Sequence, residues 1–257
     1  MKIIGVYSIK GGVGKTSTAV NMAYLSAAEG RRTLVWDLDP QGASSFYFRI
    51  KPKVKGGGGA LLRRKPELDD VIKGTDFDLL DLLPADFSYR NMDILLEGAK
   101  KRPTAQLERL LAPIRRDYDL VILDCPPSIS LMSENIFRAA NALLVPVIPS
   151  TLSARTLDQL DAFLGKDNAQ GKLRLLPFFS MVDAARSLHA ETMAQLSQDY
   201  PNMLSTSIPQ APEVERMGLH RTPLPAYAPA SAVTSAYREL WAELVAAVYS
   251  KKGRRLR

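Results

Sequence analysis

Short apolar segments alternate along the chain with longer segments in which apolar positions recur at helical spacing. This alternation is typical of a parallel sheet with helices on both faces. The strands that it predicts are residues 2–8, 33–37, 79–83, 120–124, 142–148 and 173–179. The helices that it predicts are residues 15–29, 104–116, 130–140, 151–164, 187–198 and 233–249. We therefore expect an α/β fold built on a single doubly wound, mostly parallel sheet.

Two segments interrupt the alternation. Residues 51–59 combine three lysines with four consecutive glycines, which predicts a basic, flexible loop. Residues 207–229 contain five prolines and are expected to be mostly irregular, with at most a short helix around residues 214–217. Neither segment is expected to be a domain boundary, because the sheet needs strands from both sides. The prediction is one domain over residues 1–250.

Composition and cysteine content indicate the size of the core and the cellular compartment of the protein. Of its 257 residues, 46% are hydrophobic, which is enough for one large core. No apolar run approaches the roughly 20 residues of a transmembrane helix, and the first residues lead into a strand without a signal-peptide pattern. The single cysteine, Cys125, allows no internal disulfide and fits a reducing compartment. Together with only two histidines, it also argues against structural zinc. We expect a cytoplasmic protein.

Positive charge is concentrated at the carboxyl terminus. The formal net charge is +7, and five basic residues fall in the last seven positions, which leaves about +2 for the rest of the chain. Such a tail can attract nucleic acid or anionic lipid. It can equally be a solvated, disordered end. The basic positions are Lys251, Lys252, Arg254, Arg255 and Arg257.

The strongest chemical signal is a glycine-rich segment between the first strand and the first helix. It reads Lys10-Gly11-Gly12-Val13-Gly14-Lys15-Thr16-Ser17. Glycines let backbone N–H groups converge on phosphate oxygens, and the helix N-terminus adds a positive dipole. Lys15 is expected to neutralise the β and γ phosphates, and the Thr16 hydroxyl to bind Mg²⁺. The strict Walker A pattern would have glycine at position 9, where this chain has Ile9, and position 10 carries an additional lysine.

Carboxylates follow two of the predicted strands. Asp37 and Asp39 lie in the run Trp36-Asp37-Leu38-Asp39-Pro40-Gln41-Gly42, and Asp124 ends an apolar strand before Cys125-Pro126-Pro127-Ser128. Parallel α/β sheets bind ligands at the carboxyl ends of their strands. Asp124 therefore suits a Walker B role, in which it holds Mg²⁺ directly or through water. Asp37 and Asp39 could alternatively be turn-forming residues before the proline. No histidine lies near these motifs, so the chemistry indicated is attack of water on a bound phosphate.

These motifs together resemble those of the ParA/MinD family of P-loop NTPases with a deviant Walker A motif. The resemblance rests on the Lys-Gly-Gly-x-Gly-Lys-Thr, Asp-x-Asp-Pro-Gln-Gly and Asp-x-Pro-Pro-Ser segments, and it extends over nearly the whole chain. It implies that Lys10 reaches the ATP of a second subunit. It also implies that Asp39 orients the attacking water, that Asp37 supports the metal region, and that a loop around Pro209 and Gln210 covers the adenine.

The same resemblance implies a reaction cycle and a set of partners. ATP and Mg²⁺ would lock a homodimer that binds DNA without sequence preference. A ParB-like protein or cargo adaptor would stimulate hydrolysis, and the protein would associate with the nucleoid. Many relatives carry basic residues before the last helix, where this chain has the uncharged residues 228–232. DNA contacts would therefore come from Arg216, Arg221, Arg238 or the basic tail at residues 251–257.

Three other functions are alternatives to this one. A membrane-associated positioning ATPase of the MinD kind is the first alternative, although its amphipathic anchor would insert only weakly here because Leu256 is the one apolar residue after Tyr249. An iron-protein reductase of the nitrogenase type needs two cysteine ligands per subunit and is excluded by the single cysteine. A P-loop kinase or ligase, such as a relative of dethiobiotin synthetase, remains as an alternative. The motifs after the second and fourth strands favour the partition ATPases over it.

Overall fold

One eight-stranded sheet runs through the structure, a computed structural model that describes residues 1–99, 102–167 and 173–249. The strand order is β3-β4-β2-β5-β1-β6-β7-β8. Every neighbouring pair is parallel except β3 and β4. The strands are β1 (Lys2–Val6), β2 (Thr33–Asp37), β3 (Lys73–Gly74), β4 (Leu80–Leu83), β5 (Leu120–Asp124), β6 (Ala142–Val147), β7 (Arg174–Val182) and β8 (Ser207–Pro209). The expected mostly parallel, doubly wound sheet is confirmed.

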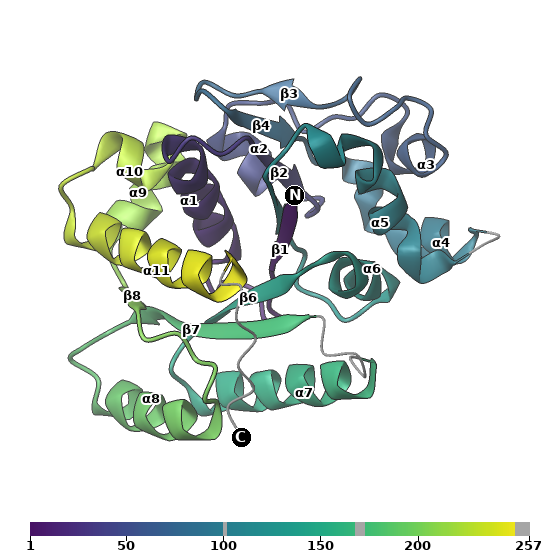
Figure 1. Cartoon of the computed structure of the whole chain (residues 1–257). Helices are drawn as coiled ribbons and strands as arrows, with labels where there is room; N and C mark the ends of the chain where they lie inside the picture. Colours follow the sequence, from purple (N-terminus) through teal and green to yellow (C-terminus); the bar gives the residue numbers. More distant parts are fainter. Residues whose placement is uncertain (100–101, 168–172, 250–257) are drawn as a thin grey trace.

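Helices cover both faces of this sheet (Figure 1). The α-helices are α1 (Lys15–Ala28), α2 (Ala43–Tyr47), α3 (Gly57–Leu62), α4 (Met92–Glu97), α5 (Gln106–Leu111), α6 (Leu131–Ala139), α7 (Thr151–Asp167), α8 (Ser187–Asp199), α9 (Pro212–His220), α10 (Leu224–Tyr227) and α11 (Ala232–Tyr249). One hydrophobic cluster joins the sheet to α1, α9, α10 and α11. A second joins its other face to α3–α8. None of the described helices combines the length and the apolar character that a bilayer crossing requires.

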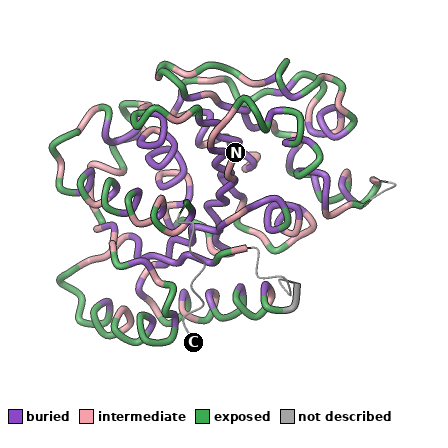
Figure 2. Tube along the Cα trace, viewed as in Figure 1, coloured by how far each residue is buried: buried purple, intermediate pink, exposed green. Residues whose placement is uncertain are grey.

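The central strands are buried along their whole length (Figure 2). Every residue of β2, β5 and β6 is buried, as the continuous apolar runs of their sequences require. The register places Asp37, the last residue of β2, directly beside Asp124, the last residue of β5. β1 lies on the other side of β5, and its Val6 also pairs with Asp124. The segment that leaves β1 therefore starts next to Asp124, with Asp37 one strand further along the sheet.

The expectation of a flexible loop at residues 51–59 is wrong for its glycine run. Gly57 begins α3, which packs against a 3-10 helix, η1 (Phe87–Asn91), and against α4. A Cβ atom at Gly58 would lie 2.9 Å from Cε of Met92 and 3.1 Å from Cδ1 of Tyr89, so glycine allows these side chains to pack closely against α3. The Ser88 hydroxyl also accepts a hydrogen bond from the N–H of Gly58. The glycines thus serve close approach between helices.

The expectation for residues 207–229 is also wrong. This segment contains β8, the nine-residue helix α9 and the short helix α10. Pro212 is the first residue of α9, a position where a missing N–H costs nothing because that group has no partner within the helix. Proline here marks the start of a helix instead of excluding one.

The single helix expected over residues 104–116 is instead divided. The 3-10 helices η2 (Pro103–Ala105) and η3 (Pro113–Arg116) flank the short helix α5. Pro113 cannot donate the backbone hydrogen bond that a continuous helix needs at that point, so α5 ends before it. The basic tail predicted at residues 251–257 lies outside the described residues.

Candidate functional site

The glycine-rich segment forms an open loop between the end of β1 and the start of α1. Gly14 is the N-cap of α1 with φ of 90°, and no side chain caps the helix. The first N–H groups of α1 are therefore available to an anion, which the helix dipole also favours. A Cβ atom at Gly14 would lie 3.1 Å from Oγ of Ser180, at the end of β7. Both the backbone angle and this contact require glycine. Gly11 and Gly12 are exposed, whereas Val13 is buried.

Two lysines belong to this loop, and they differ in burial. Lys15 is only 7% exposed, and its Nζ donates a hydrogen bond of 2.9 Å to the carbonyl oxygen of Lys10. Burial lowers the pKa of Lys15, and the nearby charge of Asp124 opposes that shift. Lys10 is half-buried, and its N–H contacts Oγ of Ser8 at 3.3 Å. Lys15 thus lies inside the site, whereas Lys10 lies at its rim.

The carboxylates of Asp37 and Asp124 are both completely buried. One oxygen of Asp124 accepts a 2.8 Å hydrogen bond from the Ser44 hydroxyl. One oxygen of Asp37 accepts two bonds of 2.7 Å, from the N–H and the hydroxyl of Ser45. Burial raises the pKa of both carboxyl groups, and the charge of Asp124 raises that of Asp37 further. Oδ1 of each aspartate has no hydrogen-bond partner.

These features fit a divalent cation bound by oxygen ligands. One buried oxygen of each carboxylate has no hydrogen-bond partner, and the pKa values of both carboxyl groups are raised. A cation bound at this position would therefore be stabilised by both groups. The Thr16 side chain lies close enough to lower the pKa of Asp124, which puts it beside these oxygens. Carboxylate and hydroxyl oxygens are the ligands that Mg²⁺ takes in proteins, with water completing its shell. Among the described residues no cluster of three or more His, Cys, Asp or Glu side chains suits a metal ion, so this small set would rely on added water or phosphate oxygens.

Asp39 lies beyond the end of β2 and is half-buried. Its Oδ1 accepts a 2.9 Å hydrogen bond from the N–H of Gln41, the contact of a turn-forming aspartate. Its charge nevertheless acts on both Lys15 and Asp124. Asp39 therefore takes part in the turn and also faces the loop and the carboxylates.

Several polar residues at this site are not evident from the sequence motifs. Ser44 and Ser45, at the start of α2, hold the two buried carboxylates, and Ser45 also accepts the N–H of Ala85 at 3.0 Å. Burial raises the pKa of Tyr47, and the nearby Ser17 side chain opposes that shift. The available signal was position, because both serines follow directly after the Asp-Pro-Gln-Gly segment. Serine hydroxyls alone are too common to single out.

Pro209 and Gln210 lie at the end of β8, the edge strand beyond β7. Pro209 is half-buried and Gln210 is exposed, and the N–H of Gln210 donates a 2.9 Å bond to the carbonyl oxygen of Val182. Val182 comes two residues after Ser180, the neighbour of Gly14. The segment predicted to cover the adenine is thus connected to the phosphate loop through the end of β7.

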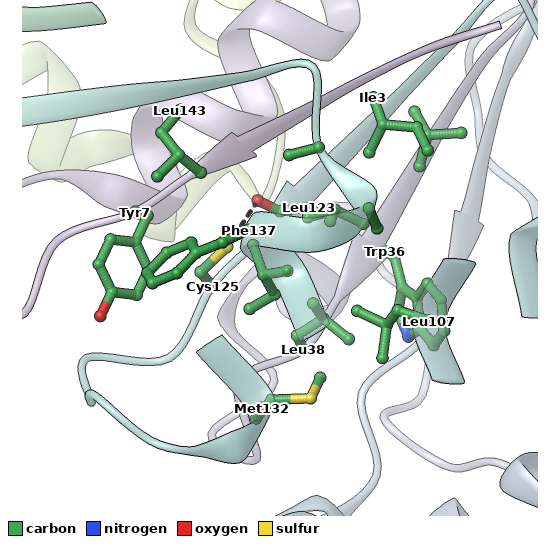
Figure 3. Packing of buried hydrophobic residues seen from close by; sticks show 14 of the residues in the cluster. Ile3, Tyr7, Trp36, Leu38, Leu107, Leu123, Cys125, Met132, Phe137 and Leu143 are labelled. Carbon is green, nitrogen blue, oxygen red and sulfur yellow. Dashed lines mark hydrogen bonds between the residues drawn. The ribbon is translucent and has the colours of Figure 1, made fainter. Parts of the chain in front are cut away.

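Cys125 follows Asp124 but points into the hydrophobic core, beside Tyr7 and Phe137 (Figure 3). Its Sγ contacts the carbonyl oxygen of Leu123 at 3.3 Å. The thiol is completely buried, and burial raises its pKa well above the usual value. A buried thiol with a raised pKa is a poor nucleophile. Cys125 is a packing residue.

The arginines predicted to contact DNA lie on α9, at its end and on α11. Arg216 and Arg238 are exposed, and Arg238 donates a 2.9 Å bond to the carbonyl oxygen of Pro229. Arg221 is half-buried, with its guanidinium 4.5 Å from the ring centre of Phe46 on α2. Arg216 is therefore the most accessible of the three. The lysines and arginines after residue 250 lie outside the described part of the chain.

A parallel α/β sheet with a glycine-rich loop after β1, a buried lysine and strand-end carboxylates defines the class of P-loop NTPases. The model of the AAA domain family matches residues 1–174. The sporulation initiation inhibitor protein Soj of Bacillus subtilis is 30% identical over 95% of this chain and 98% of its own length. The chromosome-partitioning ATPase Soj of Treponema pallidum is 28% identical over 92% and 94%. The chain belongs to the ParA/Soj family of P-loop ATPases.

Solved structures share the fold. A cobyrinic acid a,c-diamide synthase of Mycobacterium smegmatis, with bound ADP and magnesium, superposes with a TM-score of 0.82 at 26% identity, over 98% of this chain and 97% of that one. A plasmid partition protein of Borrelia burgdorferi bound to AMPPNP gives a TM-score of 0.82 at 20% identity, over 96% and 99%. The first shows that one fold serves synthases as well as partition ATPases.

Proposed function

We propose that this protein is a ParA-like ATPase that binds Mg-ATP, dimerises around it and hydrolyses it when a partner protein stimulates the reaction. The observation that carries the proposal is the pair of lysines at one loop. Lys15 is buried beside the carboxylates, whereas Lys10 stands at the rim, where it can reach outwards. Similarity to Soj over nearly the full length of both chains supports the same conclusion.

The residues divide the work between them. The N–H groups of the loop and the amino group of Lys15 bind the β and γ phosphates. Thr16 and Asp124 hold Mg²⁺, with Asp37 behind them, and bound Mg²⁺ supplies charge stabilisation on the phosphate oxygens. Asp39 accepts a hydrogen bond from the attacking water and orients it towards the γ phosphorus. Lys10 of one subunit adds positive charge to the phosphates held by the other, so hydrolysis depends on dimerisation.

The dimer is proposed to bind DNA without sequence preference through its exposed arginines, Arg216 foremost. This interaction places the protein on the nucleoid in the cytoplasm. A ParB-like protein or cargo adaptor then stimulates hydrolysis and releases the dimer from DNA. The cycle positions DNA or another cargo, and we assign it to a single domain over residues 1–250.

Light scattering coupled to size exclusion tests this proposal. The expected result is a monomer with ADP or without nucleotide and a dimer with Mg-ATP. Lys10→Gln should leave ATP affinity within about threefold and suppress DNA- and partner-stimulated hydrolysis by two orders of magnitude or more, the size of effect that a cation acting across an interface has in related phosphoryl transfer. Lys53→Gln, an exposed lysine of the loop before α3, is the matched control. Equal dimer populations in all three nucleotide states would refute the switch.

A further inference from the structure

The carboxylate of Glu243, on α11, binds the segment that leads into β8. It accepts hydrogen bonds from the N–H and hydroxyl of Ser205, at 2.8 and 2.7 Å, and from the N–H of Thr206 at 2.8 Å. The Thr206 hydroxyl donates to it as well. These donors lower the pKa of Glu243, although its partial burial opposes the shift. Four donors on one ionised carboxylate make a strong, directional attachment.

This attachment lies directly before the loop proposed to cover adenine. Leu204 is held by a 2.8 Å bond from its N–H to the carbonyl oxygen of Pro177 on β7, and its side chain is buried. β8 follows at once and ends at Pro209, which pairs with Val182. Only residues 207–209 therefore separate Thr206, the end of the Glu243 attachment, from Gln210.

β8 is held by few ladder contacts, apart from the buried side chain of Ile208. It is a three-residue edge strand, and its pairing with β7 is irregular between Phe179 and Val182. Met181, inside that irregularity, has φ of 55°, an uncommon conformation for a residue with a side chain. A short strand on an irregular partner gains few ladder hydrogen bonds. The anchor on α11 therefore acts together with Ile208 and the Gln210–Val182 hydrogen bond in setting where Pro209 and Gln210 lie.

We propose that Glu243 is a positioning residue for nucleotide binding, which holds the β8 segment so that Pro209 and Gln210 meet the adenine base. The inference rests on the proposed ATPase function, because it assumes that the loop after β1 holds the phosphates. Glu243 touches neither phosphate nor metal in this scheme. It acts through Ser205, Thr206 and β8, and it links the last helix of the chain to base recognition.

Calorimetric titration with two ligands in the presence of Mg²⁺ tests the role. ADP has both a base and phosphates, whereas pyrophosphate has only the phosphates. Glu243→Ala should raise the dissociation constant for ADP about tenfold, which corresponds to about 1.4 kcal/mol, and leave that for pyrophosphate within twofold. Glu243→Gln, which keeps the size of the side chain but has one acceptor oxygen, should give a smaller loss in the same direction. Glu239→Ala, an exposed glutamate one turn earlier on α11, is the matched control.

A second variant removes the two hydroxyl donors and keeps the two N–H donors. Ser205→Ala combined with Thr206→Val should give a smaller loss of ADP affinity with the same selectivity. Equal weakening of ADP and pyrophosphate would overturn the positioning role and indicate general destabilisation. Unchanged ADP affinity in Glu243→Ala, or equal affinity of the unaltered protein for both ligands, would overturn it too. If the unaltered protein bound neither ligand, the ATPase proposal itself would fall.

Discussion

Asp37→Asn should make the metal-free protein more stable and its stability less dependent on pH. In the folded protein the Asp37 carboxylate is fully buried, one of its oxygens has no partner, and Asp124 adds a second negative charge beside it. Burial, followed by that charge, raises the pKa of Asp37 above its usual value of 3.8. Asparagine carries no charge, yet its oxygen can still accept the two hydrogen bonds from Ser45.

The sign and size of the effect follow from proton linkage. Between the usual pKa and the raised one, the folded state keeps a proton on Asp37 that the unfolded state has released. The free energy of unfolding therefore falls as pH rises through this window, by about 1.4 kcal/mol per pH unit for one proton. Stability is highest at the acid end of the window and levels off above the raised pKa. Asp37→Asn removes this contribution.

Urea unfolding in the presence of EDTA, at several values between pH 5 and pH 8, measures the difference. The stability of Asp37→Asn relative to the unaltered protein should increase with pH over this range. Asp39→Asn, at a half-buried position outside the strand, should show a much weaker trend. Parallel pH curves for Asp37→Asn and the unaltered protein, or lower stability of the variant at pH 8, would refute the reasoning. Added Mg-ADP should stabilise the unaltered protein more than the variant at pH 8.

Three further predictions concern the same loop, the attacking water and DNA. Gly14→Ala should lose about 1–2 kcal/mol of stability through its positive φ, and it should also lose most of its ADP affinity. Gly30→Ala, with φ of 84° and no atom within 4 Å of the new Cβ, should lose only stability. Urea unfolding and ADP titration distinguish the two variants. Asp39→Asn should still form the ATP-dependent dimer but release phosphate about 100-fold more slowly, which is the lower end of the rate loss expected when a proton acceptor is removed. A normal rate would remove Asp39 from the mechanism. Arg216→Ala should weaken duplex binding and reduce the salt slope by about one, as measured by fluorescence anisotropy, and an unchanged slope would exclude a phosphate contact.

The sequence was informative where structure depends on local pattern. Buried parallel strands need continuous apolar runs, so β1, β2, β5 and β6 could be located closely. The phosphate loop could be found because its glycines, Lys15 and Thr16 act through neighbours in the chain. Asp124 could be found for the same reason, because it is the carboxylate at the end of an otherwise apolar strand. The helix α1 was bounded correctly within one residue by Gly30, whose positive φ ends it.

The sequence was less informative where structure depends on contacts between distant segments. Glycine is a poor helix former, so α3 could not be expected without knowledge that Tyr89 and Met92 pack against it. Pro212 suggested irregular structure, although it begins α9. Ser44, Ser45 and Glu243 look ordinary in the sequence. Each matters because of a partner that lies 8 to 80 residues away.

The two outermost strands of the sheet, β3 and β8, contain two and three residues. Long unpaired strand edges are the usual template by which one sheet continues into another molecule. β3 and β8 themselves offer only a few free backbone groups, so extension of the sheet from copy to copy along these two strands is a poor route to assembly. Any pairing of two copies would have to use side chains and loops, and a loop whose shape depends on bound nucleotide can make such pairing reversible.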